Sequence, residues 1–402
     1  MAKSSEKSKE VDLDKGGLAE EALKRYFQSL GSFVVRGPKV RAGRDNVTDI
    51  DVWVYTRASV NSRHITIVDV KNKRRAKGYE RLIWQRGLQS AVGADEAIVA
   101  TSGSKEELRP FADRVGIKLL SAQVLKAVIV RFAPMSSRLS SEQLDALWRK
   151  VKVEGAKDLA ALMETNLVEL GLGLSFTAMN VWIDEAAKLL VYCHDHERRP
   201  GAAARAVLML AALVAICADY MGRNAAFADI ETRRSYFREG LLFGNAEAGT
   251  ANRYLSFAEK VSTDFVDPSG ATAASIRVGF NNAVDKIPIA AFIDLFARPA
   301  AGRELFDAAM QLEIAAFSSS EPNFSALPPE GKTIIALLID YAGLERARFF
   351  KLSGEAPQRS LSGGGQPAST AGASRDHRDL AANDEDVGSD IGNEHRKSGL
   401  LF

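Results

Sequence analysis

The chain has 402 residues, with 53 Lys and Arg, 51 Asp and Glu and two Cys, and its formal net charge is +2. Hydrophobic residues make up 46% and charged residues 26%, which excludes a collagenous or wholly disordered chain. Two cysteines exclude a disulfide scaffold. The length predicts two or three domains of about 100–200 residues each.

The sequence also predicts where in the cell the protein is located. The N-terminus has no apolar segment of the signal-peptide type. The longest apolar run, Ala206 to Ala218, covers 13 residues. A membrane span needs about 20, so this run predicts a buried helix. Two cysteines in a chain of this length fit a reducing environment. We therefore expect a cytoplasmic protein without a membrane partner.

Residues 1–15 are polar and charged, and we expect them to be disordered. Helical and strand-like patterns alternate over 16–130 and predict a layered α/β domain. The expected order is helix 17–30, strands 33–35, 50–55 and 65–70, helix 79–92, strand 97–100, helix 105–115 and strand 117–120.

The pattern over 138–352 is almost entirely helical. Ser140, with Gln143 three residues later, is typical of a capping box and predicts a helix start. Apolar periodicity predicts further helices over 156–171, 178–196, 202–221, 251–263, 289–297, 301–317 and 330–350. The tail, 353–402, is rich in Gly, Ser, Ala and Asp, and we expect it to be disordered.

Positive charge is concentrated between Arg36 and Arg86, where 13 Lys and Arg stand against five Asp and Glu. Such a surface attracts polyanions, although a charge run alone is also typical of an ordinary solvated face. The residues expected to hold a nucleic-acid backbone are Lys73, Arg74, Arg75, Lys77 and Arg81.

Acidic residues and a lysine interrupt two apolar strands in the same region. Asp69 and Lys71 are two apart in one expected strand and therefore share a face. Asp51 opens the preceding expected strand. If the two strands are hairpin neighbours, Asp51 and Asp69 converge. A carboxylate pair suits Mg²⁺ or Mn²⁺, and the adjacent lysine could orient or activate water attacking a phosphodiester.

The segment 16–127, under a third of the chain, resembles the PD-(D/E)xK nuclease superfamily, most closely its Mrr-like and Holliday-junction-resolvase-like branches. The matching segments are the helix bearing Glu20, Thr48-Asp-Ile-Asp51-Val, Val68-Asp69-Val-Lys71, Gln85-Arg-Gly-Leu-Gln, and Ala97-Ile-Val-Ala-Thr101.

The resemblance implies a restriction-endonuclease-like α/β domain over 16–130, with a mixed sheet flanked by helices. It implies that Asp51 and Asp69 bind metal, that Lys71 is the catalytic lysine, and that Glu20 and Gln85 complete the site, with Glu20 as a further metal ligand. Asp49 could replace Asp51, and Glu21 could replace Glu20. Asp51 is preferred over Asp49 because it directly precedes the apolar strand Val52-Trp-Val, and Glu20 is preferred over Glu21 because its spacing from Gly16 and Gly31 resembles that of the family.

The expectation from sequence is a Mg²⁺- or Mn²⁺-dependent nuclease that hydrolyses phosphodiester bonds, in DNA rather than RNA. The resemblance alone suggests a role in bacterial defence or restriction. The alternatives are a non-catalytic nucleic-acid- or protein-binding module on the same fold and a nuclease selective for junctions or flaps. The all-helical region over 138–352 could recognise a target, form a homo-oligomer or bind a regulatory protein.

Overall fold

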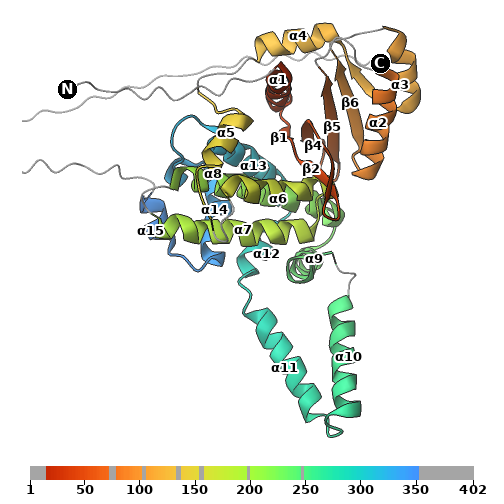
Figure 1. Cartoon of the computed structure of the whole chain (residues 1–402). Coiled ribbons are helices and arrows are strands. Elements are labelled where there is room, and N and C mark those ends of the chain that lie inside the picture. Colours follow the sequence, from red (N-terminus) through yellow and green to blue (C-terminus); the bar gives the residue numbers. More distant parts are fainter. Residues whose placement is uncertain are drawn as a thin grey trace, which may run out of the picture. The chain divides into compact units, whose positions relative to one another are not determined.

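The structure is a computed structural model, which describes residues 15–71, 78–101, 106–132, 137–153, 158–196, 200–245 and 249–352. The described residues all belong to one compact unit. Its N-terminal part is a mixed sheet with helices, and the rest is mostly helical, as expected (Figure 1). The two segments expected to be disordered, 1–15 and 353–402, lie outside the described residues except for Lys15. The separation of 16–130 from 138–352 into two domains stays a prediction.

The central sheet has the strand order β1-β4-β5-β6-β7. The first two neighbouring pairs are antiparallel and the last two are parallel. The expected hairpin between the second and third apolar strands is therefore confirmed. The strands are β1 (Phe33–Arg36), β4 (Val52–Arg57), β5 (Arg63–Lys71), β6 (Glu96–Thr101) and β7 (Lys118–Leu120).

A second, two-stranded sheet precedes β4 and was not expected from the sequence. It consists of β2 (Lys39–Ala42) and β3 (Asp45–Asp49). The residues of β3 are polar and mostly exposed, so they carry no apolar alternation that would indicate a strand.

One face of the central sheet carries the even-numbered strand residues, such as Val34, Val54 and Val68. They pack with Ala22 of α1 (Lys15–Ser29) and Leu125 of α4 (Ala122–Arg131). The helix α4 was not expected. Figure 1 shows α1 and α4 on the same side of the sheet.

The other face carries the odd-numbered residues, including Trp53, Tyr55 and Ile67. They share a core with Leu82 of α2 (Gly78–Ala91) and Ala112 of α3 (Arg109–Val115), which follows the short 3₁₀ turn η1 (Glu106–Leu108). The same core continues into the helical region. Figure 1 shows α2 and α3 on the side of the sheet away from α1.

The helical region is confirmed. The capping box at Ser140 is present, with Gln143 N donating to Ser140 Oγ at 3.2 Å. The expected helix over 330–350 is two helices, because the chain turns through Gly343 with φ at +70°. The helices are α5 (Ser141–Trp148), α6 (Leu159–Leu172), α7 (Phe176–Asp195), α8 (Pro200–Gly222), α9 (Ile230–Phe243), α10 (Thr250–Phe265), α11 (Ala271–Asp285), α12 (Ala290–Phe296), α13 (Ala301–Phe317), α14 (Pro329–Tyr341) and α15 (Arg346–Leu352).

The apolar run from Ala206 to Ala218 lies in the middle of α8 and is entirely buried, as expected. The segment Gly201–Ala225 has the length and hydropathy of a membrane span, and 89% of its most apolar stretch is buried inside the protein. That degree of burial is typical of a core helix.

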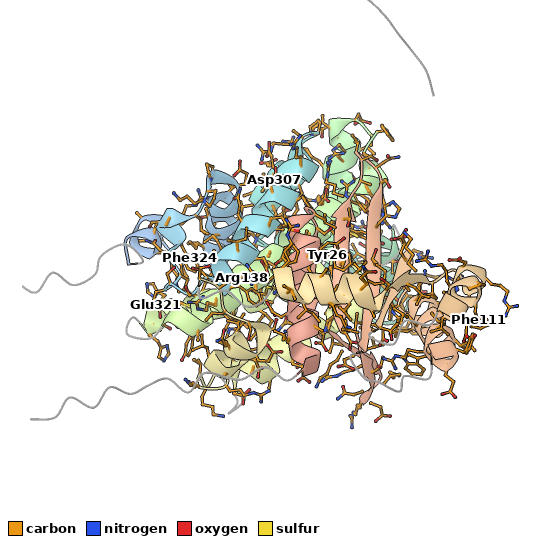
Figure 2. The ribbon with its side chains drawn as sticks, turned by 90° about the horizontal axis from the view of Figure 1, so that it is seen from above. Tyr26, Phe111, Arg138, Asp307, Glu321 and Phe324 are labelled. Atoms are coloured by element: carbon orange, nitrogen blue, oxygen red, sulfur yellow. The ribbon has the colours of Figure 1, made fainter. Side chains whose placement is uncertain are left out.

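Buried ionic contacts join the sheet to the helices. Asp219 of α8 is fully buried, accepts a hydrogen bond from Tyr55 Oη at 2.7 Å and pairs with Arg63 at 2.6 Å. In α1, Lys24 Nζ lies 2.9 Å from Glu313 Oε1 of α13. Arg138, labelled in Figure 2, pairs with the same carboxylate at 2.5 Å.

Candidate active site

Asp51 lies beside the end of β5 that carries Asp69. It is the bend residue directly before β4, whose antiparallel register pairs Val52 with Val68. Asp51 Oδ2 accepts a hydrogen bond from the backbone N–H of Val70 at 2.6 Å, which fixes this carboxylate against β5. Asp49, the alternative to Asp51, is exposed and lies opposite Lys39 in the β2–β3 hairpin. The choice of Asp51 over Asp49 as the metal ligand stays a prediction.

Lys71 belongs to the same strand as Asp69, and Gln85 belongs to the helix that packs against this strand. Lys71 is the last residue of β5, two after Asp69, so it has the same parity in the strand; its side chain lies outside the described residues. Gln85 of α2 is 1% exposed, and its Nε2 donates to the carbonyl oxygen of Ile67 at 3.3 Å. A buried amide that bonds the strand backbone two residues before Asp69 holds α2 against β5 at this point.

Arg81 binds Asp69 directly. The carboxylate is only 5% exposed, and both of its oxygens accept hydrogen bonds from the guanidinium, Oδ2 from Nε at 2.6 Å and Oδ1 from Nη2. This hydrogen-bonded contact, with the added negative charges of Asp51 and Asp49, raises the pKa of Arg81 above its usual range. The carboxylates therefore create a local potential that favours a cation.

Glu20 is not brought together with these residues. It lies on α1, which covers the opposite face of the sheet, and pairs with Arg36 Nη2 at 2.8 Å. Arg36 also pairs with Glu21 and Glu142, each at 2.8 Å. Glu20 and Arg36 line a pocket of about 300 Å³ between α1, α5 and α6. A role for Glu20 at a metal would need this cluster to rearrange, and it stays a prediction.

The described residues contain no group of three or more Asp, Glu, His or Cys side chains that could hold a metal ion. The donor set that faces the site is thus the carboxylate pair of Asp51 and Asp69. Two carboxylates are enough to bind Mg²⁺, because this ion is commonly held by one or two carboxylates while water and substrate phosphates complete its coordination. The residues therefore fit a hard divalent cation.

The expected nucleic-acid contacts can be placed only in part. The segment 72–77 lies outside the described residues and carries Lys73, Arg74, Arg75 and Lys77. It joins the end of β5 to the start of α2, and therefore begins directly beside Lys71. Arg81, the fifth expected contact, is the partner of Asp69. To contact a phosphate, Arg81 would have to release Asp69.

The pairing of Arg81 with Asp69 was not predicted, although the sequence carries a signal for it. Arg81 and Gln85 are four residues apart in α2, so their side chains share one helical face. Once Gln85 is assigned to the sheet side of α2, Arg81 must also point toward the end of β5. Because Arg81 belongs to a cluster of basic residues in the sequence, it was assigned to the solvent-facing surface, and its spacing from Gln85 was not used.

No protein-family model, curated protein or solved structure matches the chain.

Proposed function

We propose that the protein is a metal-dependent nuclease of the restriction-endonuclease-like type, which hydrolyses phosphodiester bonds in DNA with Mg²⁺ or Mn²⁺. The observation that carries the proposal is the hydrogen bond from the Val70 N–H to Asp51, which brings this carboxylate beside Asp69 in β5, with the backbone of Lys71 two residues after Asp69. A binding surface has no need of a carboxylate pair where a polyanion must approach, because like charges repel.

Each residue has a role in this proposal. Asp51 and Asp69 hold the divalent cation, which when bound polarises the phosphoryl oxygens and lowers the pKa of water. Lys71 orients the attacking water or stabilises the negative charge that develops on the phosphoryl group. Gln85 positions β5 through its bond to the Ile67 carbonyl. The basic residues after Lys71 hold the DNA backbone.

The direct test is cleavage of supercoiled plasmid and single-stranded DNA in Mg²⁺, Mn²⁺ or EDTA. We expect cutting that requires metal and that Lys71→Ala lowers by about 10²–10⁴-fold, the usual contribution of a positioned proton-transfer group. Lys118→Ala is the matched control, because Lys118 lies in β7 of the same sheet and is exposed. Cutting that survives Lys71→Ala would place the activity elsewhere.

A second candidate is a non-catalytic nucleic-acid-binding module. The pairing of Asp69 with Arg81 favours it, since a carboxylate already neutralised by an arginine does not require a metal ion. DNA binding with and without a divalent cation separates the two. A binding module holds DNA equally well in EDTA, whereas a nuclease binds more tightly once a cation neutralises the two aspartates.

A further inference from the structure

The geometry of Arg81 sets it in competition with any cation at Asp69. The guanidinium donates to both oxygens of the carboxylate in the fork arrangement that arginine forms with carboxylates. The Asp69 side chain is 5% exposed and the Arg81 side chain is 31% exposed, so the arginine is the partner of this pair that reaches solvent.

A divalent cation and this guanidinium are poorly compatible. Both use the carboxylate lone pairs as their partners. Both are positive, and at a partly buried site the repulsion between them is larger than in water. Asp51, which accepts a hydrogen bond from the Val70 N–H next to Asp69, adds a second negative charge at the position that Arg81 occupies.

We propose that Arg81 occupies the cation position in the metal-free protein, and that a divalent cation displaces it from Asp69 toward a phosphate of the bound DNA. This inference rests on the proposed function and adds a regulatory role for Arg81. The Arg81 side chain is long and 31% exposed, so a change of rotamer can carry its guanidinium away from Asp69. Arginine binds phosphate in the same forked geometry as carboxylate.

The exchange predicts opposite effects of one substitution on two ligands. Removing the competitor in Arg81→Gln should tighten Mn²⁺ binding by about tenfold, as expected when a charged hydrogen-bonded pair no longer has to be broken. In the presence of Ca²⁺, the same variant should bind a DNA duplex several-fold more weakly, because a phosphate contact is lost. Isothermal titration calorimetry of the full chain measures the first effect and fluorescence anisotropy the second.

Arg86→Gln is the matched control. Arg86 lies on α2 as well, is exposed and donates to Gln89 rather than to an aspartate of the site. Arg86→Gln removes the same charge as Arg81→Gln, so a general electrostatic effect would change the Mn²⁺ affinity equally in both variants. Equal affinities of Arg81→Gln and Arg86→Gln would overturn the proposed competition, as would weaker Mn²⁺ binding by Arg81→Gln.

A measurement on the wild-type protein follows the Arg81 side chain directly. With ¹⁵N-labelled arginine side chains, the Nε–H resonance of Arg81, identified by its absence in Arg81→Lys, should shift toward that of exposed arginines as Mg²⁺ is added. A resonance that stays in place while calorimetry shows the metal site filled would overturn the displacement and leave the nuclease proposal intact. If no variant binds metal, including Arg81→Gln, both proposals are wrong.

Discussion

At the scale of single residues, the sequence predicted the carboxylate pair and missed its partner. Asp51 and Asp69 were predictable because each interrupts an apolar strand, and strand parity fixes the face. The ion pair of Arg81 with Asp69 was not predictable, because several arginines lie nearby in the sequence. Only the packing of α2 on β5 brings Arg81 to this carboxylate. Glu20 was assigned by resemblance, and Arg36 holds it in a different cluster.

Asp69→Asn tests the residue-scale account. We expect it to abolish Mn²⁺ binding in calorimetry, because the substitution removes one of the two carboxylate charges that hold the cation. We also expect a loss of about 1–2 kcal/mol in the free energy of unfolding. This is less than the 3–5 kcal/mol typical of a broken buried pair, since Arg81 is one-third exposed and can turn to water. Urea denaturation measures the second effect. A variant that retains wild-type Mn²⁺ affinity would exclude Asp69 as a ligand.

At the scale of elements, most of the apolar strands and helices were predicted from sequence. The apolar strands and α8 were predicted because burial imposes period and composition. The hairpin of β2 and β3 and the helices α4, α9 and α11 were missed; β3 is polar and mostly exposed, and no described residue of α11 is buried. The β2–β3 hairpin depends on contacts with α6 that are distant in the sequence.

The contact between α6 and β2 gives a prediction for two glycines. A Cβ at Gly171 of α6 would lie 2.8 Å from the carbonyl oxygen of Lys39, a backbone atom that cannot rotate away. Gly171→Ala should therefore destabilise the protein by about 1–3 kcal/mol through overpacking. Gly87 of α2 has no atom within 4 Å of such a Cβ. Gly87→Ala should stabilise the protein by up to about 1 kcal/mol, because alanine favours helix.

Thermal unfolding followed by circular dichroism compares the two glycine variants. Opposite shifts of the melting temperature are expected. A Gly171→Ala protein as stable as the wild type would mean that the hairpin is not held against α6 as described.

At the scale of the whole molecule, the sheet and the helices are one packing unit within the described residues. The composition pattern predicted two regions, and each has the expected type of secondary structure. The common core and the ion pairs that cross between the regions were not predictable, since Asp219 and Glu313 lie far in sequence from Arg63 and Lys24. Such pairs can be recognised only once the tertiary structure is known.

The buried carboxylate Glu313 predicts how stability depends on pH. Burial alone would raise its pKa, but the nearby charges of Lys24 and Arg138 lower it below the ordinary 4.5. The unfolded chain therefore binds the proton more readily than the folded one. The stabilisation is present above about pH 4.5 and is lost as the pH falls through the lowered value.

Urea denaturation between pH 7 and pH 3 tests this dependence. Glu313→Gln should be less stable at pH 7 by about 3–5 kcal/mol, the usual effect of breaking a buried pair. It should also lose less stability on acidification than the wild type. Parallel curves for the two proteins would show that Glu313 has no part in the acid dependence.

The central claim is that Asp51 and Asp69 act as one metal-binding unit in phosphodiester hydrolysis. The most direct measurement is the rate of Mg²⁺-dependent plasmid cleavage by the wild type, Asp51→Asn, Asp69→Asn and the double variant. Residues that act as a unit are strongly non-additive, so each single substitution should lower the rate about as much as the double one. Wild-type protein that does not cut, or an Asp51→Asn protein that cuts at the wild-type rate, would contradict the account.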